Sequence, residues 1–507
     1  MSSSSEPEKY SIDEMMERLK TRPADENPQE GELVVREDGS QALRVRKRKR
    51  RTNQPIKEHR QHIRRSRMIQ VSASLILLLF VAFGVGLAIV YANSAPFREG
   101  LIRKISRSTG AAVELERFRM NPTHANADHL ALTWPEGNAL ASLSFSSIDA
   151  DISPSSFLGN TMSGEEVSSP ESYLTLRFPV PGKPVRETPA EEASQVGFKC
   201  YSSPKLHILL GDPTAPFARV DNTEVSFQST NANDKAQMLL NRGDITIPGW
   251  PKLRLDRSSI EFRGQTVKVL GMRLWSEGDT QGVLELTGIV SPNAADRTSS
   301  LDVALESFPL EGITGAEFAR LFSGKIETVS ATKSNLLMLK LESPPSCSLV
   351  ISFTGSLSSP FVAGGFPCLF GLSQTLGDDW FEHPEFEAGA SGVLRRVDGT
   401  IMISDLNLES KGRLTLRGSV VMAPDLKLTG TLEVGVAEGV IVSARNPRIN
   451  SMFGPPKSGV RWISLKVGGT ATTPTDNFRQ LYETAASKQQ SPSDSGTPTF
   501  EDLTAPK

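Results

Sequence analysis

The chain has 507 residues, enough for two to four domains of ordinary size, and 38% of its residues are apolar. Basic and acidic residues nearly balance, at 56 and 58, so the overall charge does not indicate a nucleic-acid-binding protein. Three cysteines exclude a disulfide-rich scaffold and a cysteine-rich zinc array.

Residues 1–67 form a polar segment with 17 basic and 12 acidic side chains. We predict a disordered cytoplasmic tail here, because the segment has almost no apolar periodicity. Its basic residues concentrate just before an apolar run, and we interpret them as topogenic charges that face anionic headgroups. A nuclear-localisation or nucleic-acid patch is the alternative interpretation. The basic cluster comprises Arg44, Arg46, Lys47, Arg48, Lys49, Arg50, Arg51, Arg64, Arg65 and Arg67.

Residues 68–93 are predicted to be a single transmembrane signal anchor. The core of this segment, from Val71 to Tyr91, contains no charged residue, and as a helix it spans about 30 Å, the thickness of the hydrocarbon layer. Twelve Lys and Arg residues lie between Arg44 and Arg67 with one acidic residue among them, whereas few basic residues come after the run. The positive-inside rule therefore predicts a cytoplasmic N-terminus, with most of the chain outside the cytoplasm.

The long segment after the anchor indicates the compartment. From Asn93 onward the sequence contains no Asn-x-Ser/Thr acceptor, which favours a bacterial envelope over the lumen of the ER or Golgi. We therefore expect a bacterial inner-membrane protein with a periplasmic body. Cys200, Cys347 and Cys368 would face an oxidising space, and whether any two of them pair stays open.

Residues 96–190 are predicted to hold a juxtamembrane helix and a first β lobe. Pro96 suits a first helical turn with Ser94 as its cap, and Gly110 suits the end of the helix. Two positions for this helix remain open, against the lipid headgroups or packed on the domain. The Pro-rich stretch 179–189 is interpreted as a long loop or a boundary between lobes.

Residues 191–485 are predicted to be a β-repeat region, and residues 486–507 a disordered tail. A strand signature of alternating apolar residues with a glycine recurs in this region. Thr314 and Glu317 form a capping-box pattern that predicts one helix over 316–322, ended by Gly324. The repeats are LELTGIV (Leu284–Val290), ISFTGSL (Ile351–Leu357), LTLRGSV (Leu414–Val420), LKLTGTL (Leu426–Leu432) and LKVGGTA (Leu465–Ala471).

In the two consecutive repeats, Leu414–Val420 and Leu426–Leu432, the regularly spaced apolar residues and the glycine all have even numbers. This alternation predicts a sheet with one apolar and one solvent-facing side. The odd-numbered Thr415 and Lys427 are expected on the solvent side. Glycines on the apolar side either bend the sheet or leave room for an apolar ligand, and both interpretations stay open. The candidate apolar groove comprises Leu414, Leu416, Gly418, Val420, Leu426, Leu428, Gly430, Leu432 and Val434.

No catalytic motif is found, and we expect neither an enzyme nor a cofactor. His124, Asp128 and His129 are the nearest approach to a metal-binding cluster, but no strand or helix spacing puts them on one face. The Ser202–Lys205 pair imitates a penicillin-binding serine site, yet Pro204 lies between them and a strand-like run comes next. That chemistry needs the lysine one helical turn after the serine.

Three segments resemble the AsmA-like proteins of double-membraned bacteria: Arg103–Phe118, Ala316–Phe322 and Val460–Phe478, the last with Gly469-Thr470 and Pro474. The resemblance covers Pro96 to about Phe478. It implies inner-membrane anchoring, a long coiled antiparallel β-sheet with an apolar groove, and roles in phospholipid traffic and outer-membrane assembly. The motifs of the family are structural, so no catalytic residue is carried over. The tail of about 67 residues departs from the family pattern, in which this segment is short.

We therefore expect a mainly β fold: one transmembrane helix, then an elongated, groove-like antiparallel sheet with a few short helices. The expected function is non-enzymatic handling of lipids in the cell envelope, with the membrane, phospholipid and envelope proteins as partners. The alternative is a scaffold that links periplasmic partners to the cytoplasmic tail. A continuous apolar groove would favour lipid handling, whereas a core filled by side chains with an aromatic surface patch would favour the scaffold.

Overall fold

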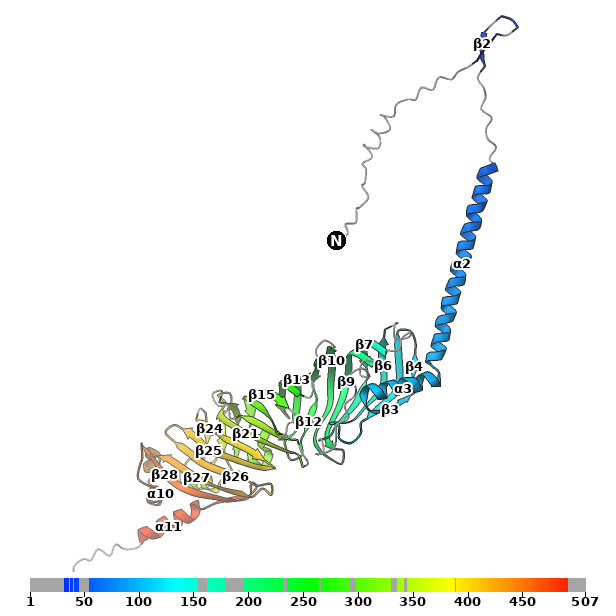
Figure 1. The fold of residues 1–507 in the computed structure, drawn as a ribbon. Coiled ribbons are helices and arrows are strands. Elements are labelled where there is room, and N and C mark those ends of the chain that lie inside the picture. The colour runs from blue at the N-terminus through cyan, green and yellow to red at the C-terminus, as the bar shows by residue number, and fades with distance from the viewer. Residues whose placement is uncertain are drawn as a thin grey trace, which may run out of the picture. The chain divides into compact units, whose positions relative to one another are not determined.

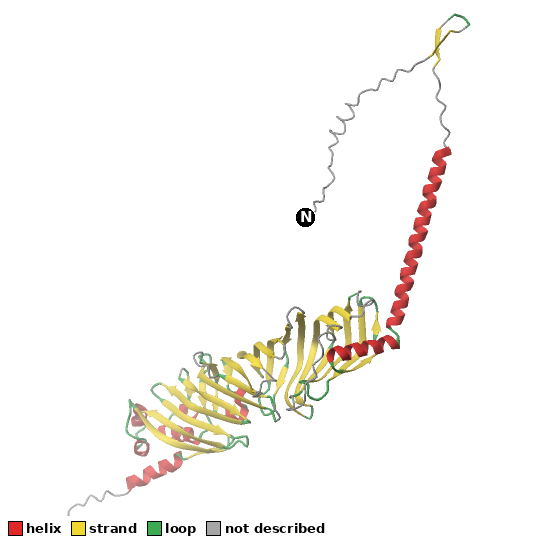
Figure 2. Cartoon of the chain, viewed as in Figure 1, coloured by secondary structure: helices red, strands yellow, loops and turns green. Residues whose placement is uncertain are grey.

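The computed structural model describes residues 32–35, 37–39, 41–44, 54–153, 162–178, 196–230, 235–263, 266–290, 298–329, 335–341, 344–387 and 389–490. The chain forms two units, Met1–Gly84 and Val85–Lys507. Figure 1 labels the elements in chain order, and Figure 2 shows that strands make up most of the second unit. The predicted mainly β fold with one long N-terminal helix is confirmed.

A short hairpin lies within the N-terminal segment. Strands β1 (Glu32–Val35) and β2 (Gln41–Arg44) pair antiparallel. Between them Gly39 has φ +81°, and an Asp-Gly pair is a frequent hairpin turn because glycine adopts positive φ freely. Residues 1–67 were predicted to be disordered. This prediction is wrong for β1, for β2 and for the start of the following helix. The side chains of the basic cluster lie outside the described residues.

Helix α2 (Gln54–Ala92) contains the predicted membrane segment. Its stretch Val71–Ala92 is long and apolar enough to cross a membrane, and its side chains in that stretch are largely exposed. The helix begins before the predicted start at residue 68, because Arg, Gln and Lys are good helix formers and can extend an apolar helix beyond the bilayer.

Helix α3 (Ala95–Thr109) comes directly after it and confirms that the segment between Pro96 and Gly110 is helical. Pro96 lies in its first turn, and Gly110 ends it at φ +71°, with the Gly110 N–H donating to the Ser106 carbonyl over 2.8 Å. Leu101 is buried and Ile105 packs into a hydrophobic cluster of the β unit. One side of this helix is therefore packed on the domain.

Most strands of the second unit form one long sheet. In its first part they are β3 (Ala112–Glu116), β4 (Arg119–Met120), β5 (His124–Thr133), β6 (Leu140–Ile152), β7 (Met162–Ser168), β8 (Glu171–Leu176), β9 (Val196–Asp212), β10 (Ala215–Thr230), β11 (Lys235–Asn241), β12 (Asp244–Thr246), β13 (Leu253–Arg263), β14 (Thr266–Ser276) and β15 (Asp279–Val290).

The sheet continues through β16 (Thr298–Glu306), β17 (Phe308–Pro309), β19 (Lys325–Thr328), β20 (Leu336–Lys340), β21 (Ser346–Gly355), β24 (Ala390–Val397), β25 (Thr400–Ser410), β26 (Leu414–Met422), β27 (Leu428–Ala437), β28 (Val460–Gly469) and β29 (Pro474–Asp476). A small second sheet contains β18 (Phe322–Ser323), β22 (Phe361–Ala363) and β23 (Glu385–Phe386).

The long sheet is mixed, which corrects the prediction of an antiparallel one. Strands β7 and β8 both pair parallel with β9, whereas the other pairings described are antiparallel. A parallel pair needs a connection long enough to return to the same end of the sheet, and residues 177–195 separate β8 from β9. The two predicted segments 96–190 and 191–485 thus share one sheet.

Register shifts recur near the middle of the long strands. They interrupt the pairing of β10 with β9 near Asn222, of β13 with β14, and of β25 with β26 near Asp405. Asn222 and Asp405 have φ of +56° and +52°. Bulges of this kind bend a strand and increase its twist. After a bulge, the residues that face the core change from odd-numbered to even-numbered positions, or the reverse.

Helices gather at the C-terminal part of the sheet (Figure 1). They are α6 (Glu311–Thr314), α7 (Ala316–Ala319), α8 (Pro367–Leu376), the 3₁₀ turn η1 (Asp379–Glu382), α9 (Glu438–Ser443), α10 (Pro447–Met452) and α11 (Phe478–Gln490). The helix predicted over 316–322 is present but shorter: α7 covers Ala316–Ala319, and Phe322 lies in β18. Gly315, at φ +86°, separates two one-turn helices, and the Thr314 hydroxyl donates to the Leu310 carbonyl instead of capping a helix.

Candidate functional site

The residues of the predicted groove do lie together on one face of the sheet. Leu416 pairs with Val434, Gly418 with Leu432, and Val420 with Gly430, and directly paired residues share a face. Leu426 differs from the others, because it lies in the turn between β26 and β27 at φ +65°. The predicted parity therefore holds within β26 and β27.

This part of the face is a filled core. The side chains of the predicted groove in β26 and β27 are at most 2% exposed. They belong to one hydrophobic cluster with residues of three helices: Leu369 and Leu372 of α8, Ile441 of α9 and Ile449 of α10. None of these three helices was predicted from the sequence. Leu414 to Val434 thus pack against protein side chains.

Thr415 was predicted on the solvent side, but it is only 8% exposed. It pairs with Gly435, which pairs in turn with Trp462. The Trp462 ring lies where a Cβ of Gly435 would point, and Arg417 stacks on that ring at 4.9 Å. An aromatic patch therefore covers the outer face at this point.

A longer apolar feature emerges from the strand pairing. Starting at Met120, each residue pairs with the next across neighbouring strands, so all of them lie in one cross-strand row. We call this the apolar row: Met120, Ala125, Ala150, Val167, Tyr201, Phe227, Met238, Ile260, Val269, Gly288, Leu301, Leu337 and Leu349.

Exposure varies along the apolar row. Met120, Ala125 and Ala150 are buried at its start, and Leu301 and Leu349 are buried near its end. Between them, Val167, Tyr201, Phe227 and Met238 retain accessible surface, whereas the next two residues, Ile260 and Val269, are 8% and 5% exposed. An apolar ligand can therefore reach the row at two stretches, from Val167 to Met238 and again around Leu337.

A second apolar row widens this surface. It runs through Val113, Leu132, Leu143, Leu174, Ile208, Val220, Ile245 and Leu253. Ile208, Val220 and Leu253 pack in the same hydrophobic cluster as Phe262 and Met238. The two rows thus form adjacent parts of one apolar face.

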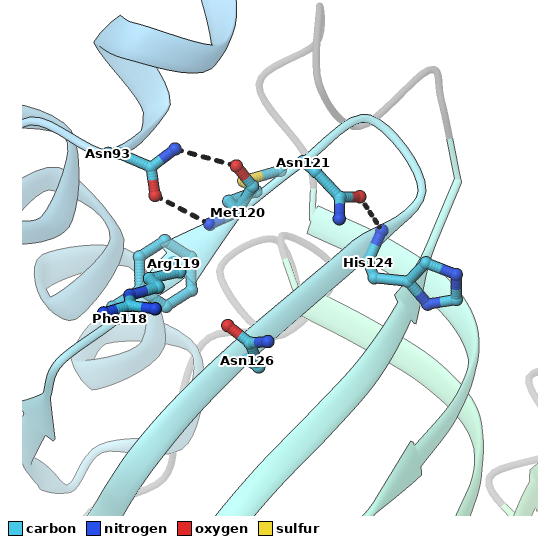
Figure 3. A pocket seen from close by; sticks show the side chains of 7 residues that line it. All are labelled: Asn93, Phe118, Arg119, Met120, Asn121, His124 and Asn126. Atoms are coloured by element: carbon cyan, nitrogen blue, oxygen red, sulfur yellow. Dashed lines mark hydrogen bonds between the residues drawn. The ribbon is translucent and has the colours of Figure 1, made fainter.

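The apolar row begins beside the end of the candidate span. Ala92, the last residue of the candidate span, is buried in a cluster with Met120, Ala125 and Ile152. The Asn93 side chain binds the Met120 backbone twice, donating to its carbonyl over 2.8 Å and accepting from its N–H over 2.9 Å (Figure 3). The Asn93 side chain therefore makes the two backbone hydrogen bonds that a paired strand would make, and it holds Met120, the first residue of the row, in place.

A pocket of about 570 Å³ opens at this point, and its lining is mainly polar. It is lined by Asn93, Phe118, Arg119, Met120, Asn121, His124 and Asn126 (Figure 3). The Asn121 side chain accepts the His124 N–H over 2.7 Å and so shapes the turn into β5.

The residues considered for metal binding do not converge. His124 lies 2.8 Å from Asp151, and Asp128 pairs with Arg117 at 3.1 Å. Across the described ranges no three His, Cys, Asp or Glu side chains gather closely enough to hold a metal ion.

The other end of the apolar row meets a charge. Leu349 pairs with Arg396, and Arg396 pairs with Ile401. Arg396 is 3% exposed and lines a cavity of about 540 Å³ together with Phe217, Trp250 and Cys347. The sequence analysis did not single out this residue. The alternation Gly392, Leu394, Arg396 was the available signal that it faces inward.

All three cysteines are free, and Cys347 and Cys368 are buried. Burial raises the pKa of the Cys347 thiol to about 12 and raises that of Cys368 as well. Both thiols are therefore protonated at neutral pH and are poor nucleophiles.

We expect iodoacetamide at neutral pH to modify the half-buried Cys200 first. Cys347 and Cys368 should react only after denaturation, because both are covered and protonated. Peptide mass spectrometry of the detergent-solubilised chain measures the order. Rapid modification of Cys368 in the folded protein would contradict the packed core around α8.

The chain was compared with protein-family models, with curated proteins and with solved structures, and none of them matches it.

Proposed function

We propose that this chain is a membrane-anchored, non-enzymatic protein of a bacterial envelope that carries lipid acyl chains on the apolar face of its sheet. The apolar row is the observation that supports this most strongly, since it begins against Ala92 at the end of the candidate span. Each CH₂ group of an acyl chain gains about 0.8 kcal/mol on leaving water. Binding therefore needs no directional polar contact.

The proposed path lies in a different place from the groove expected from sequence. It runs over the half-buried middle of the apolar row and not over Leu414 to Val434, which are packed against helices. At about 4.8 Å per strand, the row reaches about 60 Å from Met120 to Leu349. Transfer over a longer distance would need a partner protein.

A scaffold function is the second candidate, and one observation favours it. The C-terminal part has a filled core and carries the Trp462–Arg417 patch on its outer face. Aromatic and arginine side chains are enriched where proteins bind one another. This patch would recruit another envelope protein, with or without lipid on the apolar row.

Photo-crosslinking from Met238 tests lipid handling. Met238 belongs to the apolar row, whereas its neighbour Leu239 points to the other face and is 37% exposed. A photoreactive residue at Met238 should give lipid adducts in cells, detected by mass spectrometry. The matched position Leu239 should give few, although it is well exposed.

Equal adducts at Met238 and Leu239 would indicate random contact with lipid or detergent and would contradict the proposal. Protein adducts at Trp462 without lipid adducts at Met238 would favour the scaffold.

The proposed orientation places the N-terminus in the cytoplasm and the β unit in the periplasm. It rests on the basic residues before the span. Alkaline phosphatase fused to the C-terminus should be active, and a fluorescent protein that folds only in the cytoplasm should stay dark there. Replacing the basic residues of 44–67 by Gln should weaken this orientation. A fluorescent C-terminal fusion would reverse the assignment.

A further inference from the structure

Arg396 is a cation buried without an anionic partner. Its side chain is 3% exposed, and within the described ranges no carboxylate lies within 4.0 Å of its guanidinium. A buried charge is costly unless it is paired or fully hydrogen-bonded. Burial accordingly lowers the pKa of Arg396.

The hydrogen bonds of Arg396 leave part of its guanidinium unused. Nη1 donates to the Ile313 carbonyl over 2.6 Å, and Nη2 donates to the Gly249 carbonyl. Nε is buried and has no hydrogen-bond partner. Since a guanidinium carries five N–H donors, a group with anionic oxygens would satisfy donors that these two carbonyls do not.

The surroundings of Arg396 are apolar apart from one carboxylate. Trp250 stacks under the guanidinium at 4.6 Å, and Phe217 and Ile247 line the same cavity. Asp398 also lines it and is exposed. The Asp398 carboxylate repels further negative charge in the cavity, so a ligand with one negative charge fits better than a ligand with two.

The position of Arg396 links this cavity to the apolar row. It is the next residue after Leu349 in the row, beyond a series of apolar residues and Gly288. An amphiphile with its chain on the row would thus meet one cation where the row ends.

We propose that Arg396 and its cavity bind the singly charged anionic headgroup of an amphiphile whose acyl chain lies over the half-buried part of the apolar row around Leu337, two strands away. The anionic oxygens could belong to the carboxylate of a fatty acid or to the phosphodiester of a phospholipid. This inference rests on the proposed lipid-binding function, which it extends from chains to headgroups.

The test compares ligands with the same chain and different headgroups. Tritiated palmitate and tritiated hexadecanol are bound to the full-length protein in detergent, and inorganic phosphate and dioleoylphosphatidylglycerol serve as competitors. Wild-type protein should bind palmitate at least about tenfold more tightly than hexadecanol, as charge-assisted hydrogen bonds predict. Arg396→Met should remove this difference by lowering the affinity for palmitate towards that for hexadecanol.

Arg395→Met is the matched control, because Arg395 is exposed on the other face of the same strand. It should keep the wild-type preference. Arg396→Lys should keep part of the preference, since it retains the charge but loses the planar donor pair. Competition by phosphatidylglycerol would identify the phosphodiester as a ligand, and its absence would leave the fatty-acid carboxylate.

Three outcomes would overturn the inference. Wild-type protein that binds hexadecanol and palmitate equally has no headgroup site, whether or not the variant folds. Loss of the preference in Arg395→Met would show that surface charge causes it. Competition by inorganic phosphate as strong as by phosphatidylglycerol would indicate a site for a free anion. Failure to bind either labelled ligand would instead contradict the proposed function.

Discussion

Gly418→Val is expected to destabilise the β unit by about 3 kcal/mol or more, or to prevent its folding. Gly418 has φ +137°, and a Cβ at this position would overlap the carbonyl oxygen of Thr431 on the paired strand. Valine is strained at positive φ, and the carbonyl belongs to the backbone and cannot turn aside. Overpacking and backbone strain therefore add. Thermal unfolding of the detergent-solubilised chain, followed by tryptophan fluorescence, measures the loss.

Thr415→Val provides the control on the same strand. Thr415 is also buried, but its backbone is ordinary β and valine has nearly the same shape. We expect a change of at most about 1 kcal/mol from the lost hydroxyl. Equal losses in the two variants would show that the position of Gly418 beside the β25–β26 bulge is not special.

The two helices α2 and α3 could be predicted because their signals are local. Pro96 and Gly110 mark the two ends of α3 within the sequence itself, and the apolar run needs no partner to be recognised. The parity of β26 and β27 could be predicted for the same reason, since no bulge interrupts either strand between Leu414 and Val436.

The filled core could not be predicted, because it depends on what covers the sheet. Helix α8 reads PCLFGLSQTL. Its Leu369, Leu372 and Leu376 have helical spacing, but ten residues are too few for this pattern to tell a short buried helix from a strand. Its Pro367 and the terminating Gly377 were nevertheless usable signals. Where such helices pack on the apolar face of the sheet, the face becomes part of a filled core and no open groove remains.

The apolar row could not be predicted either. Bulges near Asn222 and other positions exchange the inward parity within single strands. A pattern of period two therefore appears broken in the sequence although the face is continuous. Residues such as Met120 and Leu349 are linked only through the successive pairing of many strands. Strand alternation places Arg396 on the inner face of the sheet. Its burial without a carboxylate partner depends on the segments around Gly249 and Ile313, which are far away in sequence.

A single charge in the middle of the apolar row is expected to stop lipid movement along it. Met238→Glu puts a carboxylate on the half-buried stretch between Phe227 and Ile260. An acyl chain passing this point would have to strip water from the charge, which costs several kcal/mol. With a photoreactive residue at Leu337, farther along the row, lipid adducts should fall at least about tenfold. Adducts at Tyr201, nearer the membrane helix, should persist.

Leu239→Glu is the matched control, because it places the same charge one residue away on the opposite, exposed face. Adducts at Leu337 should then stay at the wild-type level, and both variants should unfold at similar temperatures. Persistence of the Leu337 adducts in Met238→Glu would mean that lipids reach this position without passing along the row. Equal loss in both variants would trace the effect to charge or expression. Loss in Met238→Glu alone would establish the row as the path.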